Sequence, residues 1–180
     1  MRDRSSHSVT TSRSTIRLAR SSDVETIVDI WHRGWTEVHR GQVPPALEAR
    51  RTRLDMRQAA ESRVSDIYVA TVGDAVVGFV ASHDDEVEHL YVSPESRSTG
   101  AASRLLAEAE ATIARGAPMG WLAVVSGNML ARTFYERRGW ICRGRFNHTA
   151  RVDSGTISLE AVRYEKGFWP TAAEDIRTFR

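Results

Sequence analysis

Several residue types are scarce in this 180-residue chain, and each scarcity narrows what the protein can be. Cys142 is the single cysteine, so no internal disulfide can form, and no group of His, Cys or acidic residues has metal-ligand spacing. We therefore expect a reducing, cytoplasmic setting and no metal. Apolar runs fall short of the roughly 20 residues that cross a bilayer, so we expect no membrane span. The N-terminus also lacks the apolar core of a secretory signal.

Lysine is almost absent too, because Lys166 is the only one. The other basic residues are scattered arginines, and the formal net charge is only +2. No basic patch is visible in this distribution, so we do not expect a nucleic-acid partner. Hydrophobic residues make up 41% of the chain, which is enough for the core of one α/β domain.

The chain divides into one globular domain and two short tails. Residues 1–14 are rich in Ser, Thr and Arg without apolar periodicity, which predicts a disordered tail. Residues 15–166 carry globular patterning, and residues 167–180 form a C-terminal tail. Phe168 and Trp169 begin that tail, and we expect them to pack on the body or on a second subunit.

Periodicity and turn signals predict a mixed sheet with helices on both faces. A helical crossover between two strands implies that those strands are parallel neighbours. Ser22 and Glu25 form a capping box that opens the first helix, and Pro45 begins a second helix ending near Arg63. The predicted strands are 15–18, 67–72, 76–81, 86–92, 121–125, 140–147 and 157–166, with further helices after residue 100 and from Asn128 to about Arg138.

The junction after the strand at 86–92 is the most informative segment. An apolar strand ending in Leu90-Tyr91-Val92 passes through a turn into a helix whose first residues are nearly all small, Arg97-Ser98-Thr99-Gly100-Ala101-Ala102. Small side chains let backbone N–H groups approach an anion, and a helix N-terminus attracts negative charge. The segment therefore predicts a phosphate site, although an ordinary strand-to-helix corner has the same residues.

A second segment, residues 128–140, reads as a capped helix followed by Gly139. Asn128 is suited to cap it, Phe134 to fill the core and Tyr135 to lie at an interface with its hydroxyl bonded. Taken alone, these residues need no functional explanation.

Together the strand at 86–92, the turn at 97–102 and the segment at 128–140 resemble the acyl-CoA-dependent N-acetyltransferases of the GNAT superfamily, over about residues 15–166. The resemblance implies an α/β fold in which a central mixed sheet is flanked by helices on both faces. It also implies that acetyl-CoA is the co-substrate. The activity implied is acetyl transfer to a primary amine of a small molecule, peptide or protein by direct attack in a ternary complex.

The family motif of Arg or Gln, two residues, Gly, one residue, then Gly or Ala matches Arg97, Gly100 and Ala102, whereas Ser98 stands where glycine is frequent. In the family a bulge separates the preceding strand from the next parallel one, which leaves room for the pantetheine arm. The cofactor-binding residues implied are Leu90, Tyr91, Val92, Arg97, Ser98, Thr99, Gly100, Ala101, Ala102, Asn128 and Phe134.

The resemblance also implies catalytic roles. Tyr135 is the expected proton donor to the departing thiolate, because a phenol keeps its proton at neutral pH. Glu86 is our preferred base for the amine. Glu88 lies on the same face of a regular strand, and His89 is a third candidate, so the sequence does not separate them. A solvated acidic strand end has the same composition.

The acceptor in this family is bound by the segment after the first helix and by the loop between the last two strands. Trp31, Trp35 and His39 are the candidates here, although the two tryptophans also fit the apolar stripe of their helix and we favour the core for both. Dimers are common in the family, so a homodimer is an expected assembly.

Two alternatives differ in class. A non-catalytic CoA-binding regulatory module on the same fold would bind CoA without releasing it from acetyl-CoA. A nucleotide-binding α/β domain would need a G-x-G-x-x-G or a G-x-x-x-x-G-K-[ST] run, and this chain has neither.

Overall fold

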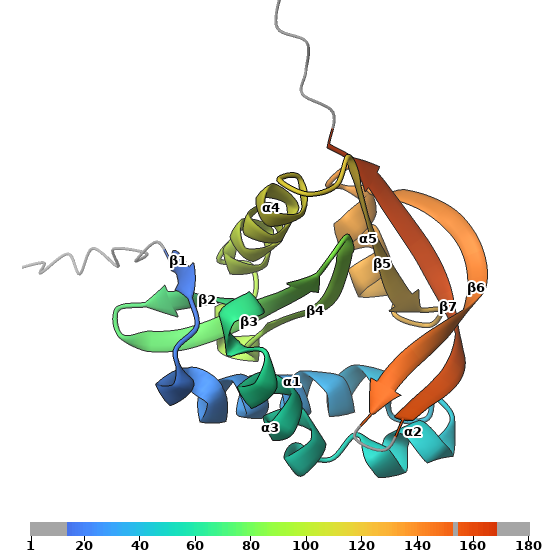
Figure 1. Ribbon diagram of the computed structural model, residues 1–180, viewed down its shortest axis with the longest axis horizontal. Helices are drawn as coiled ribbons and strands as arrows, with labels where there is room; N and C mark the ends of the chain where they lie inside the picture. Colours follow the sequence, from blue (N-terminus) through green and yellow to red (C-terminus); the bar gives the residue numbers. More distant parts are fainter. Residues whose placement is uncertain (1–13, 153–154, 169–180) are drawn as a thin grey trace, which may run out of the picture.

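The computed structural model describes residues 14–152 and 155–168, which form one mixed β-sheet covered by helices on both faces (Figure 1). The elements are β1 (Thr15–Leu18), α1 (Val24–His39), α2 (Pro45–Arg50), α3 (Arg53–Ser62), β2 (Ile67–Val72), β3 (Ala75–His83), β4 (Glu86–Val92), α4 (Ala101–Ile113), β5 (Met119–Val125), α5 (Met129–Glu136), β6 (Ile141–Val152) and β7 (Gly155–Gly167), with single 3-10 turns at Ser21–Asp23, Val64–Asp66 and Pro94–Ser96. Within the described ranges, no helix is long and apolar enough to cross a membrane.

The seven strands lie in the order β1-β2-β3-β4-β5-β7-β6. Every neighbouring pair is antiparallel except β4 and β5, which are parallel and connected through α4. This is the arrangement that the helical crossover predicted, and it confirms the fold class.

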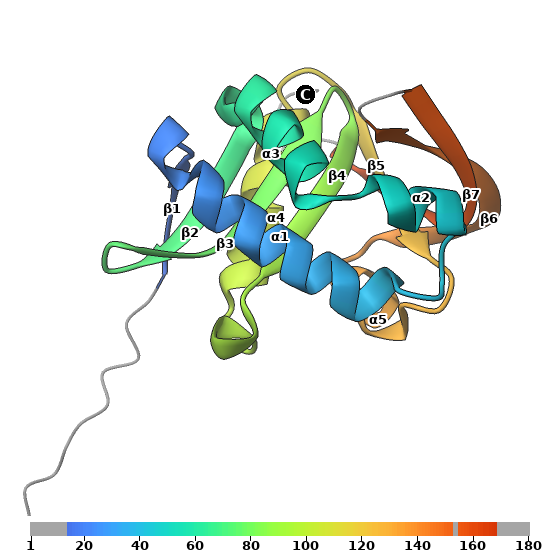
Figure 2. The same cartoon turned by 90° about the horizontal axis from the view of Figure 1, so that it is seen from below.

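The core forms two layers, one on each face of the sheet. Phe79 and Val80 in β3 illustrate the alternation, because Phe79 packs with α1 and α3 while Val80 packs with α4. In Figure 2, α1 and α3 cross the near face of the sheet and α4 lies behind it. A third, smaller cluster joins Leu47 of α2 to Val125, Ala150 and Leu159, where α2 lies beside the β6–β7 hairpin.

Two helix predictions were wrong. The helix expected from Pro45 to about Arg63 is two helices, because Arg51 leaves the helical conformation and Thr52 caps α3 by accepting a hydrogen bond from the amide of Asp55 at 3.2 Å. The capping box expected at Ser22 and Glu25 lies two residues earlier, in the 3-10 turn before α1, where the carboxylate of Asp23 accepts from the amide of Arg20 at 2.7 Å.

The last hairpin is longer than expected. β6 extends to Val152 and β7 begins at Gly155, whereas the sequence predicts that the first strand ends at residue 147 and the second begins at residue 157. The added residues pair in register from Asn147 and Glu160 to Val152 and Gly155. Most of β6 is exposed and polar, so the apolar alternation that marks a strand is weak there.

The tail assignments fall mostly outside the described residues, at 1–13 and 169–180. Ser14, which we had placed in the first tail, is buried, and its carbonyl oxygen accepts a hydrogen bond from Arg104 of α4. Phe168 packs edge-on against Trp140, with 6.3 Å between ring centroids, as expected for packing on the body.

Candidate functional site

A cleft of about 1060 Å³ opens between the C-terminal halves of β4 and β5. Its walls come from elements far apart in the sequence: the C-terminal part of α1, the α2–α3 junction, β4, the start of α4, β5, α5 and the middle of β6 and β7. Figure 1 shows β4 and β5 diverging where the cleft lies.

A bulge in β4 accompanies this divergence. His89 pairs with Ala81 of β3 and Val87 with Ser82, so Glu88 has no partner on β3. Val87 consequently packs under α4, while His89, two residues later, stacks on Trp31 on the opposite face. Toward β5, only Glu86 is paired with a residue of that strand, Trp121. The rest of β4 therefore presents an unpaired backbone edge to the cleft.

The turn after β4 has the geometry of an anion cradle. Ser98 and Gly100 adopt left-handed conformations, with φ of 66° and 86°. No backbone carbonyl in the described ranges accepts a hydrogen bond from the amides of residues 98–103. Six consecutive N–H groups at a helix N-terminus, among small side chains, are suited to bind phosphate oxygens.

Arginines flank this cradle. Arg97 is paired with Glu37 of α1, through Nη1 to Oε1 at 3.0 Å and through a second contact between Nη2 and Oε2. Arg138 donates a hydrogen bond to the hydroxyl of Ser103, and its guanidinium lies 3.8 Å from the ring centroid of Phe134. The cleft therefore has a cation beside the free amides that the sequence motif did not identify.

The two strand glutamates have different surroundings. Glu88 is paired with Arg63 at 2.6 Å, lies 4.0 Å from Arg151, and its side chain is 12% exposed. Glu86 has no ion-pair or hydrogen-bond partner for its side chain among residues 14–152 and 155–168. Burial and the nearby charge of Glu88 raise the pKa of Glu86 to about 7. The structure thus separates two residues that the sequence left equivalent.

Tyr135 is buried, at 9% exposure, between Phe134 and Trp140, and it lines the cleft. Burial raises the pKa of its phenol well above the usual range, so the hydroxyl stays protonated at neutral pH. Nothing in the described ranges accepts from or donates to this hydroxyl, whereas the hydroxyl of Tyr164 is bonded to both Arg132 and Glu136.

Most of the predicted cofactor residues line this cleft. They are Leu90, Tyr91, Val92, Arg97, Ser98, Gly100, Ala101, Ala102, Asn128 and Phe134. Thr99 is not a lining residue, because its hydroxyl turns back to donate to the carbonyl of Ser96 at 2.7 Å. Asn128 also caps α5, and its Oδ1 accepts from the amide of Ala131 at 3.1 Å.

The acceptor candidates separate into two groups. Trp35 and His39 line the cleft and stack on each other, with 5.2 Å between centroids. Trp31 is 2% exposed and packs in the core between Phe79 and His89, which is the position we favoured for it, and it does not line the cleft. The apolar stripe of α1 accounts for its position.

Several polar lining residues were not among the predicted site residues, including Gln42, Arg51, Arg138 and His148. Arg138 directly precedes Gly139 at the end of the α5 motif, which is a signal that could have been used. Gln42 and His148 come from the two segments expected to bind the acceptor, the one after the first helix and the one between the last two strands. Arg51 is brought to the cleft by the helix break, which was not expected. Among the described residues, no group of three or more His, Cys, Asp or Glu side chains is arranged to hold a metal ion.

Comparison with known families identifies the fold's relatives. The family model described as the acetyltransferase (GNAT) domain matches residues 45–151, more than half of the chain. This chain belongs to the GNAT acetyltransferase family. As a GNAT member it is an acyltransferase, and its cleft lies at the divergent parallel strands of that fold. No curated protein matches the GNAT chain in sequence.

Solved structures share the GNAT fold at low sequence identity. A putative acetyltransferase from Salmonella typhimurium, yncA, solved with acetyl-CoA, is 18% identical with a TM-score of 0.66, over 91% of this chain and 99% of that one. Ard1 from Thermoplasma volcanium is 20% identical with a TM-score of 0.65, over 88% and 99%. The PaiA N-acetyltransferase from Thermoplasma acidophilum, solved with coenzyme A, is 19% identical with a TM-score of 0.60, over 86% and 99%.

The left-handed conformation of Ser98 gives a stability prediction. Because a non-glycine residue is strained at φ 66°, Ser98→Gly should raise the free energy of unfolding, by up to about 1 kcal/mol, in denaturant titration. The control is Ser93→Gly, at φ −56°, where glycine relieves no strain, adds freedom to the unfolded chain and removes the hydroxyl that bonds Glu95, so stability should fall. Equal losses in both variants would contradict the geometry assigned to this turn.

Proposed function

We propose that this GNAT acyltransferase transfers the acetyl group of acetyl-CoA to a primary amine, by direct attack in a ternary complex. The observation that carries the proposal is the placement of Glu86 and Tyr135, a candidate base and a candidate acid, in one cleft whose other end holds the free amides of residues 98–103. Structural neighbours solved with acetyl-CoA and with coenzyme A support the choice of cofactor.

The residues present fit coenzyme A. The amides of Ser98, Thr99, Gly100, Ala101 and Ala102 would bind the pyrophosphate, with Arg138 adding positive charge. The unpaired edge of β4 at Leu90, Tyr91 and Val92 would bond the peptide-like pantetheine arm as another strand would. Asn128 and Phe134 would contact the arm from α5. The side chain of Arg97 is paired with Glu37, so Arg97 would contribute its backbone and its positive charge to the phosphate site rather than a direct side-chain hydrogen bond.

Bound acetyl-CoA supplies the activated acyl group, as a thioester. Glu86 removes the proton of the amine, because its carboxylate has no partner and its pKa of about 7 suits proton transfer at neutral pH. Glu88 is held by Arg63 and instead raises the pKa of Glu86 through its charge.

Tyr135 gives its proton to the sulfur as the carbon–sulfur bond breaks. Its buried phenol stays protonated near neutral pH, and its hydroxyl is not engaged by any described side chain. The amine nitrogen forms the new bond to the acyl carbon as the bond from that carbon to sulfur breaks. One proton passes from the amine to Glu86, and one passes from Tyr135 to the sulfur. Holding amine and thioester together supplies about 7 to 11 kcal/mol of the barrier reduction.

The direct test is thiol release. The purified protein is incubated with acetyl-CoA and a panel of primary amines, and both free CoA and the N-acetylated product are measured. Release of CoA in step with N-acetyl product is the expected result. CoA binding by calorimetry without release by any amine would instead identify a regulatory CoA-binding module.

The base assignment predicts a pH profile. Since Glu86 must be deprotonated, kcat/KM should rise as the pH increases through about 7, and Glu86→Gln should remove this limb and lower kcat by about 10² to 10⁴. In the control Glu88→Gln, loss of a negative neighbour lowers the pKa of Glu86, so the limb should persist at lower pH. An unchanged profile in Glu86→Gln would exclude Glu86 as the base.

The acid assignment predicts a split between turnover and affinity. Tyr135→Phe removes only the hydroxyl, so kcat should fall by about 10² to 10⁴ while the Kd of acetyl-CoA, measured by calorimetry, stays nearly constant. Tyr68→Phe is the matched control, because Tyr68 lies in β2 and does not line the cleft. Full turnover in Tyr135→Phe would remove Tyr135 from its role.

A further inference from the structure

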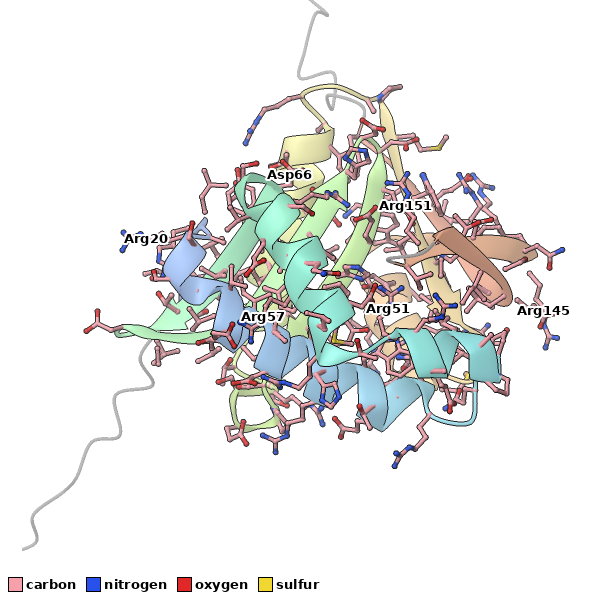
Figure 3. All side chains as sticks on the ribbon, turned by 60° about the horizontal axis from the view of Figure 1, so that its bottom comes forward. Arg20, Arg51, Arg57, Asp66, Arg145 and Arg151 are labelled. Atoms are coloured by element: carbon pink, nitrogen blue, oxygen red, sulfur yellow. The ribbon has the colours of Figure 1, made fainter. Side chains whose placement is uncertain are left out.

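Arg51 is a buried arginine in the wall of the cleft that the proposed chemistry does not use. Its side chain is only 9% exposed, and it lies where α2 ends and α3 is about to begin (Figure 3). The break between these two helices places it there, because Arg51 is the C-cap of α2.

The guanidinium of Arg51 is held in place by hydrogen bonds, but not all of its N–H donors have an acceptor. Its Nη1 donates to Asp55 at 3.2 Å and its Nη2 donates to the carbonyl of Arg151 at 2.8 Å, and its Cζ lies 5.8 Å from the ring centroid of Trp31. Its Nε is buried without a hydrogen-bond partner in the described ranges. An arginine has five N–H donors in a planar fork, so this one has capacity left for an anionic oxygen.

Asp55 is paired with Arg51 at 3.2 Å, and neutral histidines lie near the rest of its guanidinium. Burial chiefly lowers the pKa of His39, His89 and His148, and the positive charge of Arg51 lowers each further. The neighbouring arginines are engaged differently, because Arg63 contacts Glu88 at 2.6 Å and Arg151 approaches the same carboxylate at 4.0 Å. A polycationic amine would therefore meet these arginines and, of the two strand glutamates, would find only Glu86 unpaired.

The rest of this end of the cleft is apolar. Leu47, one turn before Arg51 in α2, packs with Val125, Ala150 and Leu159, and all four line the cleft. An acceptor seated here would have an amine toward Glu86, an anionic group toward Arg51 and an apolar remainder.

We propose that the acceptor is an amino carboxylate with an apolar side chain, whose carboxylate binds Arg51. This inference rests on the proposed function and specifies its substrate class. The charged fork of Arg51 would recognise the carboxylate, while the cleft wall at Leu47 and Leu159 would contact the side chain.

A matched set of acceptors tests the carboxylate without any mutation. L-leucine, L-leucinamide and 3-methylbutylamine share one side chain, and their kcat/KM values are compared per unprotonated amine by CoA release. Because a charged hydrogen bond is stronger than a neutral one, L-leucine should exceed both others by at least about tenfold. Spermidine should be poorer still.

Variants then test whether Arg51 is responsible. Arg51→Gln should abolish the preference for L-leucine over L-leucinamide, and Arg51→Lys, which keeps a cation beside Asp55, should retain part of it. Arg53→Gln is the control, since Arg53 is exposed, pairs with Asp29 and does not line the cleft. Calorimetry of L-leucine binding in the presence of CoA gives a readout independent of turnover, and the affinity should fall in Arg51→Gln.

The outcomes separate the two proposals. Equal use of the three amines, or an equal loss for all three in both Arg51 variants, would overturn the carboxylate assignment and leave acetyl transfer intact. Absence of CoA release with every amine would overturn both.

Discussion

The separation of β4 from β5 is the constraint on which the rest of this structure depends. Parallel neighbours normally pair along their length, yet here Glu86 and Trp121 are the one pair between them. The extra residue at Glu88 disrupts β4 at this point, and α4 still connects the two strands across the face of the sheet. The result is a cleft with an unpaired backbone edge along one wall and the first turn of α4 at its end.

The same bulge organises the charges. It sets Glu88 against Arg63 and leaves Glu86 without a partner, so one carboxylate is neutralised and the other has a pKa near 7. Burial around His39, His89 and His148 keeps the imidazoles neutral. The cleft thus contains the unpaired carboxylate of Glu86, the protonated phenol of Tyr135 and the guanidinium of Arg51, whose Nε has no partner in the described ranges. Under the proposed function each has a different part in the reaction.

Local sequence signals were sufficient for the strand at 86–92, the cradle at 97–102 and the cap at Asn128, because each depends on residues adjacent in the chain. The helix break was missed although Thr52 is itself a local capping signal, and with it the position of Arg51 in the cleft was missed too. They also do not distinguish Trp31 in the core from Trp35 at the cleft, since both lie on the apolar stripe of α1. Glu86 and Glu88 became distinct only once Arg63, 25 residues before Glu88, was seen to pair with one of them.

Hydrogen exchange of the backbone amides tests most directly whether the cleft holds coenzyme A as proposed. In the free protein, the amides of residues 98–103 have no backbone acceptor and should exchange fast. Saturating CoA should slow exchange at these amides and along the free edge of β4, while the β2–β3 turn at Gly73 and Asp74 stays unaffected. Unchanged exchange at residues 98–103 in the presence of bound CoA would contradict the account.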